Sequence, residues 1–202
     1  MASHFAVLPI YGAATGPGEP TATLLDVDGV RILLDCGWSD RLQAEEDEST
    51  NSGGGGGNGG GGPLTRLLAA AATAHALLLS HADLAHLGAL VAVADALPPG
   101  APILATTPVA RLGRLALYDA VLARADAVDA GAVPPLPPGA ATVEAVDAAF
   151  DGVSSLRYRQ PFKLATSGAG AAQGEASDDD AGRENRAAAD AAGAGAAAAL
   201  TL

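Results

Sequence analysis

A short apolar run that ends in a polar cluster and is followed at once by a helical pattern is the feature that most constrains this chain. Residues 75–80 are short and apolar enough for a buried strand, and from residue 86 to 97 the apolar residues recur at helical spacing. A helix is also predicted before the strand, because Pro63 suits a first helical turn and leucines follow it. Helix, buried strand and helix in succession predict an α/β fold.

Two further apolar runs near the N-terminus predict a β-hairpin. Residues 21–27 and 30–35 are separated by Asp28-Gly29, the two-residue turn typical of hairpins. Residues 4–11 predict a short strand, and Pro9 confines it to an edge or ends it there.

The second half of the chain continues the alternation of strands and helices. Strands are predicted over 102–106 and 156–160, and a helix over 142–150 with Thr142 as its N-cap. Another helix starts at Pro108. Its predicted buried face contains five apolar residues: Val109, Leu112, Leu115, Ala116 and Leu122.

Two segments are too poor in large apolar residues to order themselves. Residues 39–62 are acidic and then almost pure glycine, which predicts a disordered insertion. Residues 165–202 predict a low-complexity tail, and residues 126–141 a Pro- and Gly-rich linker. The folded domain is therefore expected to consist of 1–38 and 63–164.

Charge and cysteine content narrow the function classes. A net charge of −12 argues against unaided, tight nucleic-acid binding, which needs cationic groups. The single cysteine, Cys36, excludes an internal disulfide, suits a reducing compartment and is expected to be a small buried residue. No secretory leader and no apolar run long enough for a membrane span is visible, so we expect the cytosol or the nucleus and no membrane.

The candidate functional residues gather at the ends of two predicted strands. His81, Asp83 and His86 lie within six positions after the strand over 75–80. The two histidines are either zinc ligands or hydrogen-bonded residues kept at a strand end. For Asp83 the alternatives are a metal ligand and the N-cap of the next helix. Asp35 ends the strand before, and we expect it to hydrogen-bond backbone near the His81 loop.

The residues around these positions resemble a known family. Asp35-Cys36-Gly37-Trp38 and Leu78–Leu90 resemble metallo-β-lactamase folds of the β-CASP type, and above all the larger, non-catalytic subunits of that type in the cleavage and polyadenylation specificity factor. Further segments that fit are Phe5–Gly12, Ala105–Val109, Leu117–Asp119 and Val143–Phe150. The resemblance covers residues 4–164, apart from the insertion, and implies the N-terminal half of an αββα sandwich.

The departures from the family pattern imply a vestigial metal site. Active relatives have His-x-His-x-Asp-His after this strand and bind two zinc ions. Asp83 stands where the second histidine should be, and Ala85 where the aspartate should be. The resemblance thus assigns Asp35, His81, Asp83 and His86 to a vestigial site with no catalytic residue, no metal ligand and no cofactor, although three ligands alone do not forbid zinc.

The resemblance also implies a setting for the chain. It predicts a nuclear, non-catalytic scaffold in pre-mRNA 3′-end processing, bound to other subunits of the cleavage and polyadenylation complex. One of those subunits is the active endonuclease, and pre-mRNA is reached through the complex. The alternatives are a zinc-dependent hydrolase or nuclease of the same fold, and a truncated gene product without independent function.

Overall fold

The computed structural model describes residues 4–12, 18–51, 61–129 and 142–164, with backbone only for 50–51 and 125–129. The chain divides into two compact units, 1–160 and 161–202, and all of the described helices and strands lie in the first. The predicted tail, 165–202, lies outside the described residues, as does most of the predicted linker.

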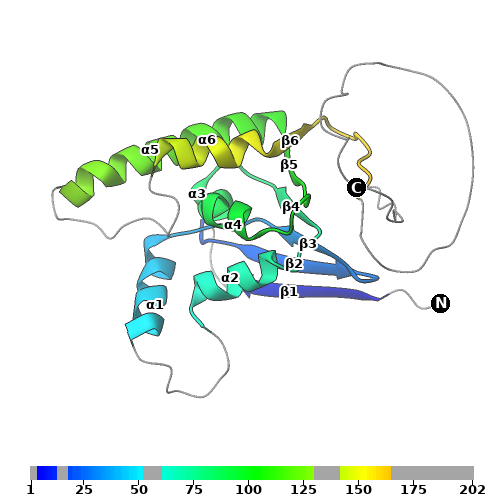
Figure 1. Cartoon of the computed structure of the whole chain (residues 1–202), viewed down its shortest axis with the longest axis horizontal. Coiled ribbons are helices and arrows are strands. Elements are labelled where there is room, and N and C mark those ends of the chain that lie inside the picture. The colour runs from blue at the N-terminus through cyan, green and yellow to red at the C-terminus, as the bar shows by residue number, and fades with distance from the viewer. Residues whose placement is uncertain (1–3, 13–17, 52–60, 130–141, 165–202) are drawn as a thin grey trace, which may run out of the picture. The chain divides into compact units, whose positions relative to one another are not determined.

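One mixed sheet organises the described part of the first unit, with its strands in the order β1-β2-β3-β4-β5-β6 (Figure 1). β1 to β3 are antiparallel, and β3 to β6 are parallel. The strands are β1 (Phe5–Tyr11), β2 (Ala22–Val27), β3 (Val30–Leu34), β4 (Ala76–Leu79), β5 (Ile103–Thr106) and β6 (Val153–Leu156). The α/β class predicted from the sequence is confirmed.

The β2–β3 turn has the backbone that its sequence predicts. Asp28 and Gly29 have φ values of 53° and 85°. A two-residue turn with both residues in the left-handed region matches the twist of antiparallel strands, and Asp and Gly tolerate that region best. The register pairs Val27 with Val30 across the turn, so the predicted hairpin is confirmed.

Helices pack against one face of the sheet and form the core with it. They are α2 (Pro63–Ala71), α3 (Leu84–Leu87), α4 (Leu90–Ala96), α5 (Thr107–Asp129) and α6 (Val143–Asp151), and α1 (Asp40–Asn51) packs against α2. Figure 1 shows α2, α3 and α4 in front of the strands, with α5 and α6 side by side above them. Leu33 and Leu77, neighbours in β3 and β4, are fully buried in this core.

The opposite face of the sheet is also apolar. Because side chains alternate along a strand, Leu25, Leu34 and Leu78 point away from the helices. A cavity of about 360 Å³ opens on this face beside Leu34 and Leu78. Parallel sheets with apolar side chains on both faces are normally covered by a layer of structure on each face.

The prediction of disorder over 39–62 is wrong for residues 40–51, which form α1. Leu42 is 2% exposed and Gln43 is 7% exposed, so one side of this acidic helix is buried. Glu46 is also buried and bonds to the start of α2. The prediction failed because average composition does not reveal a few contacts made to a distant element. Residues 52–60 lie outside the described residues.

The predicted buried face of the helix after Pro108 is wrong for three of its five residues, whereas Val109 and Ala116 are half-buried. Leu112, Leu115 and Leu122 are 57%, 60% and 57% exposed. The face that packs inward holds Gly113 and Leu117 instead, and a Cβ at Gly113 would lie 2.5 Å from a methyl carbon of Leu87. α5 approaches Leu87 closely at Gly113, because glycine has no side chain. Counting leucines along the helix does not reveal such a contact.

Two element boundaries also differ from the predictions. The helix expected over 86–97 is α3 and α4, separated where Gly88 packs against Trp38. The strand expected over 156–160 is β6, Val153–Leu156, which pairs with β5 and ends before a turn. By contrast, Thr142 caps α6 as predicted, since its Oγ1 accepts a hydrogen bond from the Ala145 amide at 3.2 Å.

Candidate functional site

The candidate site lies where two parallel strands end at the same edge of the sheet. Asp35 follows β3, and Ser80 with His81 follows β4, its parallel neighbour. Asp35 has a φ of 59°, a left-handed conformation that Asp tolerates better than most residues. Its amide still donates to the Leu78 carbonyl at 2.9 Å, so the strand ladder continues to this residue.

The Asp35 carboxylate joins the two strand ends. Its Oδ1 accepts a hydrogen bond from the Ser80 amide at 2.8 Å, and its Oδ2 accepts one from the Ser80 hydroxyl at 2.6 Å. Asp35 is 9% exposed, and a buried carboxylate needs such donors. The predicted hydrogen bond to backbone beside His81 is therefore present, and the side-chain bond to Ser80 was not foreseen.

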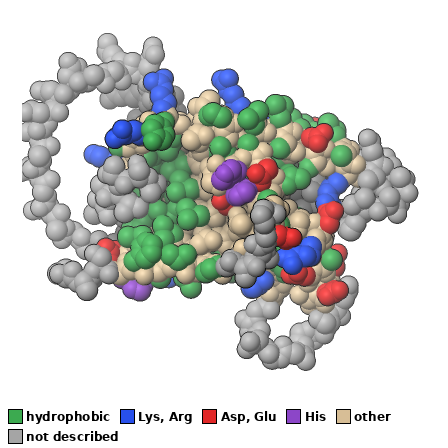
Figure 2. Space-filling model, turned by 180° about the vertical axis from the view of Figure 1, so that it is seen from behind, with side chains coloured by type: hydrophobic (Ala, Val, Ile, Leu, Met, Phe, Trp, Pro, Cys, Tyr) green, Lys and Arg blue, Asp and Glu red, His purple; other side chains and the backbone are tan. Residues whose placement is uncertain are grey.

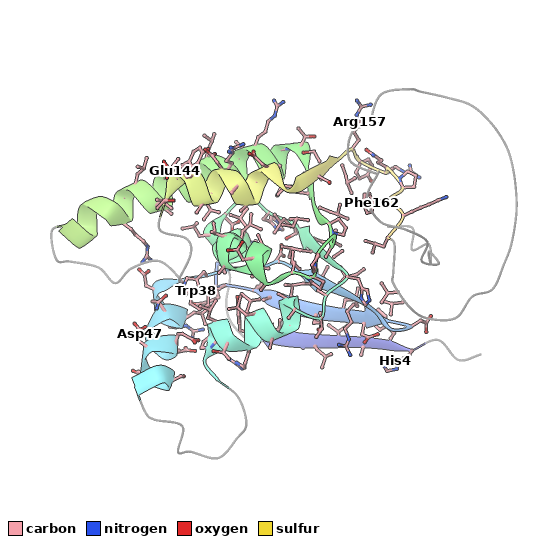
Figure 3. The ribbon with its side chains drawn as sticks, viewed as in Figure 1. His4, Trp38, Asp47, Glu144, Arg157 and Phe162 are labelled. Carbon is pink, nitrogen blue, oxygen red and sulfur yellow. The ribbon has the colours of Figure 1, made fainter. Side chains whose placement is uncertain are left out.

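The Cys36–Trp38 segment is hydrogen-bonded to the backbone of α3. The Cys36 amide donates to the His86 carbonyl at 2.7 Å, and the Trp38 amide to the Leu84 carbonyl at 2.8 Å. Between them a Cβ on Gly37 would lie 1.7 Å from the Ala85 carbonyl oxygen. Figure 3 labels Trp38 between α1 and the layer of α3 and α4, where it is buried. The Asp-Cys-Gly-Trp motif thus has a packing reason that does not involve a metal.

Hydrogen bonds assign the His81 tautomer. Ser80 Oγ lies 2.8 Å from His81 Nδ1. The Ser80 hydroxyl proton is directed to Asp35, since a carboxylate only accepts. Ser80 Oγ therefore accepts from His81, whose Nδ1 carries a proton.

His86 is oriented by Asp83. The Asp83 Oδ1 lies 2.6 Å from His86 Nδ1, so His86 donates from Nδ1 to this carboxylate. The rings of His81 and His86 are 4.3 Å apart between centroids and tilted by 36°. Figure 2 shows a patch of histidine on the rear face, with acidic side chains beside it and hydrophobic ones over the neighbouring area.

Neither predicted role of Asp83 describes what its carboxylate does. The residue occupies the N-cap position of α3 with an extended backbone, but its side chain makes no capping hydrogen bond. The carboxylate instead binds the ring of His86, three residues along the chain. A carboxylate that holds a histidine in one tautomer is a supporting group for that ring.

The residues present do not fit a two-zinc centre. Among the described residues no group of three or more His, Cys, Asp or Glu side chains comes together in a way that could hold a metal ion. Ala85 contributes only its carbonyl, which accepts from the Thr21 amide at 2.9 Å. His81 and His86 offer two imidazole nitrogens, and a zinc site needs at least three protein ligands.

Burial keeps the other polar groups near the site neutral. Burial first, and the Asp35 charge second, raise the pKa of the Cys36 thiol far above its ordinary range. Burial, followed by interaction with Cys36, raises the pKa of Tyr11 in the same way. The Tyr11 hydroxyl donates to the Gly37 carbonyl at 2.6 Å. Cys36 is thus the small buried residue that was predicted.

Sequence reasoning missed a polar cluster between α5 and α6. Arg114 and the Tyr118 hydroxyl both donate to the Asp147 carboxylate. The Tyr118 hydrogen bond first, and the Arg114 one second, lower the pKa of Asp147. Arg114 and Tyr118 are at i and i+4 on α5, a spacing that could have revealed them.

His75, predicted at a surface or helix end, accepts a hydrogen bond from the Arg31 amide at 3.0 Å through Nδ1.

Comparisons with known proteins give this arrangement its context. A model of the metallo-beta-lactamase superfamily domain matches residues 63–172. The chain is 38% identical to cleavage and polyadenylation specificity factor subunit 2 of Oryza sativa subsp. japonica over 170 residues, which are 84% of this chain and 19% of that protein.

Two more relatives have similar names. Subunit 2 of Arabidopsis thaliana is 34% identical over 170 residues, with the same shares of 84% and 19%. The probable subunit 2 of Drosophila melanogaster is 31% identical over 152 residues, 75% of this chain and 17% of that one. The chain therefore spans about a fifth of the length of the curated relatives it matches. None of its described helices is long and apolar enough to cross a membrane.

Proposed function

The chain belongs to the metallo-beta-lactamase superfamily, and we propose that within it this chain is a non-catalytic scaffold of a cleavage and polyadenylation complex. Its place of action would be the nucleus, in pre-mRNA 3′-end processing. Its partners would be other subunits of that complex, one of them the active endonuclease, with pre-mRNA reached through the complex. The names of the relatives support membership of such a complex.

One observation carries the non-catalytic part of the proposal. The Asp83 carboxylate is bound to the Nδ1 of His86, and the neighbouring Ala85 has no donor atom in its side chain. A two-metal hydrolase needs a carboxylate to hold the second ion about 3.5–4 Å from the first. Here the Asp83 carboxylate already binds a histidine, and the family's aspartate position holds only the methyl group of Ala85. We therefore propose that the chain binds no zinc and hydrolyses no phosphodiester.

Zinc content and nuclease activity of the purified full chain test this proposal. We expect well below one zinc per chain after exposure to excess zinc and desalting, and no cleavage of a single-stranded RNA with zinc supplied. The double substitution Asp83→His with Ala85→Asp is the matched control, because it restores the family's ligand types. We expect it to bind zinc more tightly than the unmodified chain, since it exchanges a carboxylate for an imidazole at position 83 and adds a carboxylate at position 85.

Two results would overturn the proposal. Stoichiometric zinc in the unmodified chain, lost in His81→Ala, would support the zinc hydrolase instead. Failure of the chain to co-purify with any subunit of a cleavage and polyadenylation complex from a nuclear extract, under conditions where an intact subunit 2 does so, would contradict the scaffold role.

A further inference from the structure

The outward face of α5 carries an apolar stripe that the described part of the chain leaves uncovered. Leu112, Leu115 and Leu122 are each more than half exposed. α5 is 23 residues long, or about 35 Å at about 1.5 Å per residue, so the stripe runs along a long, regular element. Its inward face is already occupied by packing through Gly113 and Leu117.

The spacing of the stripe is that of a helix-pairing seam. Pro108, Leu112, Leu115, Asp119 and Leu122 follow one another at intervals of four, three, four and three residues. This alternation keeps one narrow line of side chains facing a partner helix. Three of these five positions are exposed leucines, so the stripe fits a helix lying alongside α5.

Asp119 makes the seam selective for orientation. The residue is exposed and lies within the stripe. If two copies of α5 paired in parallel, Asp119 would meet Asp119 of the second copy, and two like charges would be desolvated together. Antiparallel pairing separates them, and one polar residue in a seam is known to fix the alignment of a helix pair.

Arg111 supplies the complementary charge. Arg111 and Asp119 each lie four residues from Leu115, on opposite sides of it. They are about 12 Å apart along their own helix, too far to bond to each other, and no ion pair of either is found within the described residues. A two-fold axis through Leu115 brings Arg111 of each copy opposite Asp119 of the other.

We propose that α5 is a self-association surface, on which a second copy of this chain docks its own α5 in antiparallel orientation about Leu115. The interface is isologous, because the same patch serves both copies. Leu115 meets Leu115 of the second copy at the centre, Leu112 packs beside it, and two reciprocal Arg111–Asp119 pairs flank the leucines. The surface is separate from the strand ends that carry His81 and His86.

Sedimentation of the full chain over a range of concentrations tests the proposal at about 0.15 M salt, where long-range repulsion between the acidic chains is screened beyond about 8 Å. We expect the mass to rise from 19.7 kDa towards twice that value. Leu115→Glu should return the chain to a monomer. Leu8→Glu, at another exposed apolar residue, should leave the dimer intact. Circular dichroism checks that each variant is folded.

Charge reversal keeps the proposal open to refutation even if Leu115→Glu unfolds the chain. Arg111→Asp and Asp119→Arg should each weaken the dimer about tenfold or more, and combining them in one chain should restore it, because the reciprocal pairs form again with opposite sign. A chain that is monomeric at every concentration, a dimer that survives Leu115→Glu, or one that is lost in Leu8→Glu would overturn the proposal. So would a double reversal as weak as the single ones.

Discussion

Removing the Glu46 side chain tests whether α1 is part of the folded domain. Glu46 Oε2 accepts a hydrogen bond from the Leu64 amide at 2.8 Å, and Oε1 accepts one from the Thr65 hydroxyl at 3.1 Å. Leu64 is in the first turn of α2, whose N-cap residue is Gly62 and has no capping side chain. A carboxylate from α1 thus satisfies the open end of α2, where a negative charge is also favoured by the helix dipole.

The expected cost of Glu46→Ala is about 2–3 kcal/mol. A hydrogen bond to a charged group contributes about 1.5–3 kcal/mol, and the longer bond to Thr65 adds a few tenths. With a urea dependence of about 1–3 kcal/mol/M, the midpoint of unfolding should fall by about 0.7–3 M with an unchanged slope. Hydrogen exchange at the amides of α1 should quicken in the same variant, because α1 loses its attachment to α2.

The neighbouring Glu48→Ala provides the matched control. Glu48 lies on the same helix but is exposed, so its removal should change the free energy of unfolding by no more than about 0.5 kcal/mol. Equal midpoints and equal exchange rates in the two variants would refute the reasoning. They would mean that residues 40–51 behave as the disordered insertion that composition predicts.

Two other substitutions test single contacts. Gly37→Ala should lower the free energy of unfolding by about 3 kcal/mol or more in urea titrations. The reason is that the new Cβ would lie 1.7 Å from the Ala85 carbonyl oxygen, and backbone cannot move aside. Gly152→Ala is the near-neutral control, because its Cβ would have only an ordinary contact at 3.4 Å. Asp147→Asn should flatten the dependence of stability on acidic pH. Because the pKa of Asp147 is lowered in the folded chain, its contribution is complete above its ordinary pKa of about 3.9 and is lost as the pH falls through the lowered value. An unchanged urea midpoint for Gly37→Ala, or identical acid profiles with and without Asp147, would contradict these assignments.

Local chemistry made the hairpin, the central strand and the α6 cap predictable from the sequence. Asp28-Gly29 fits one kind of turn, and Thr142 stands directly before an apolar helical pattern, so neither prediction needed a distant partner. α1 was missed because Glu46 finds its partner 18 residues away, beyond the glycine-rich stretch. The face of α5 was misassigned because Gly113 decides the packing, and a missing side chain carries no hydrophobic signal.

The candidate site was predictable in its residues but not in its connections. Position along the chain put His81, Asp83 and His86 together, and the family pattern identified Asp83 and Ala85 as the departures from it. The hydrogen-bond partner of each carboxylate could not be predicted in this way, because it depends on which groups the fold brings close in space. Asp83 binds a ring three residues later, and Asp35 binds a hydroxyl from another strand end.

The hydrogen bonds of Asp35 and Asp83 help to hold the geometry at the ends of β3 and β4. When a metal ligand loses its metal, a buried polar group is left without a partner, which costs about 1–3 kcal/mol. Here both oxygens of the buried Asp35 are satisfied by Ser80, and the exposed Asp83 binds His86. The backbone crossing of Cys36 and Trp38 with α3 adds bonds that need no ion. The strand ends are therefore joined through bonds between the chain's own residues, which is in keeping with the non-catalytic scaffold proposed above.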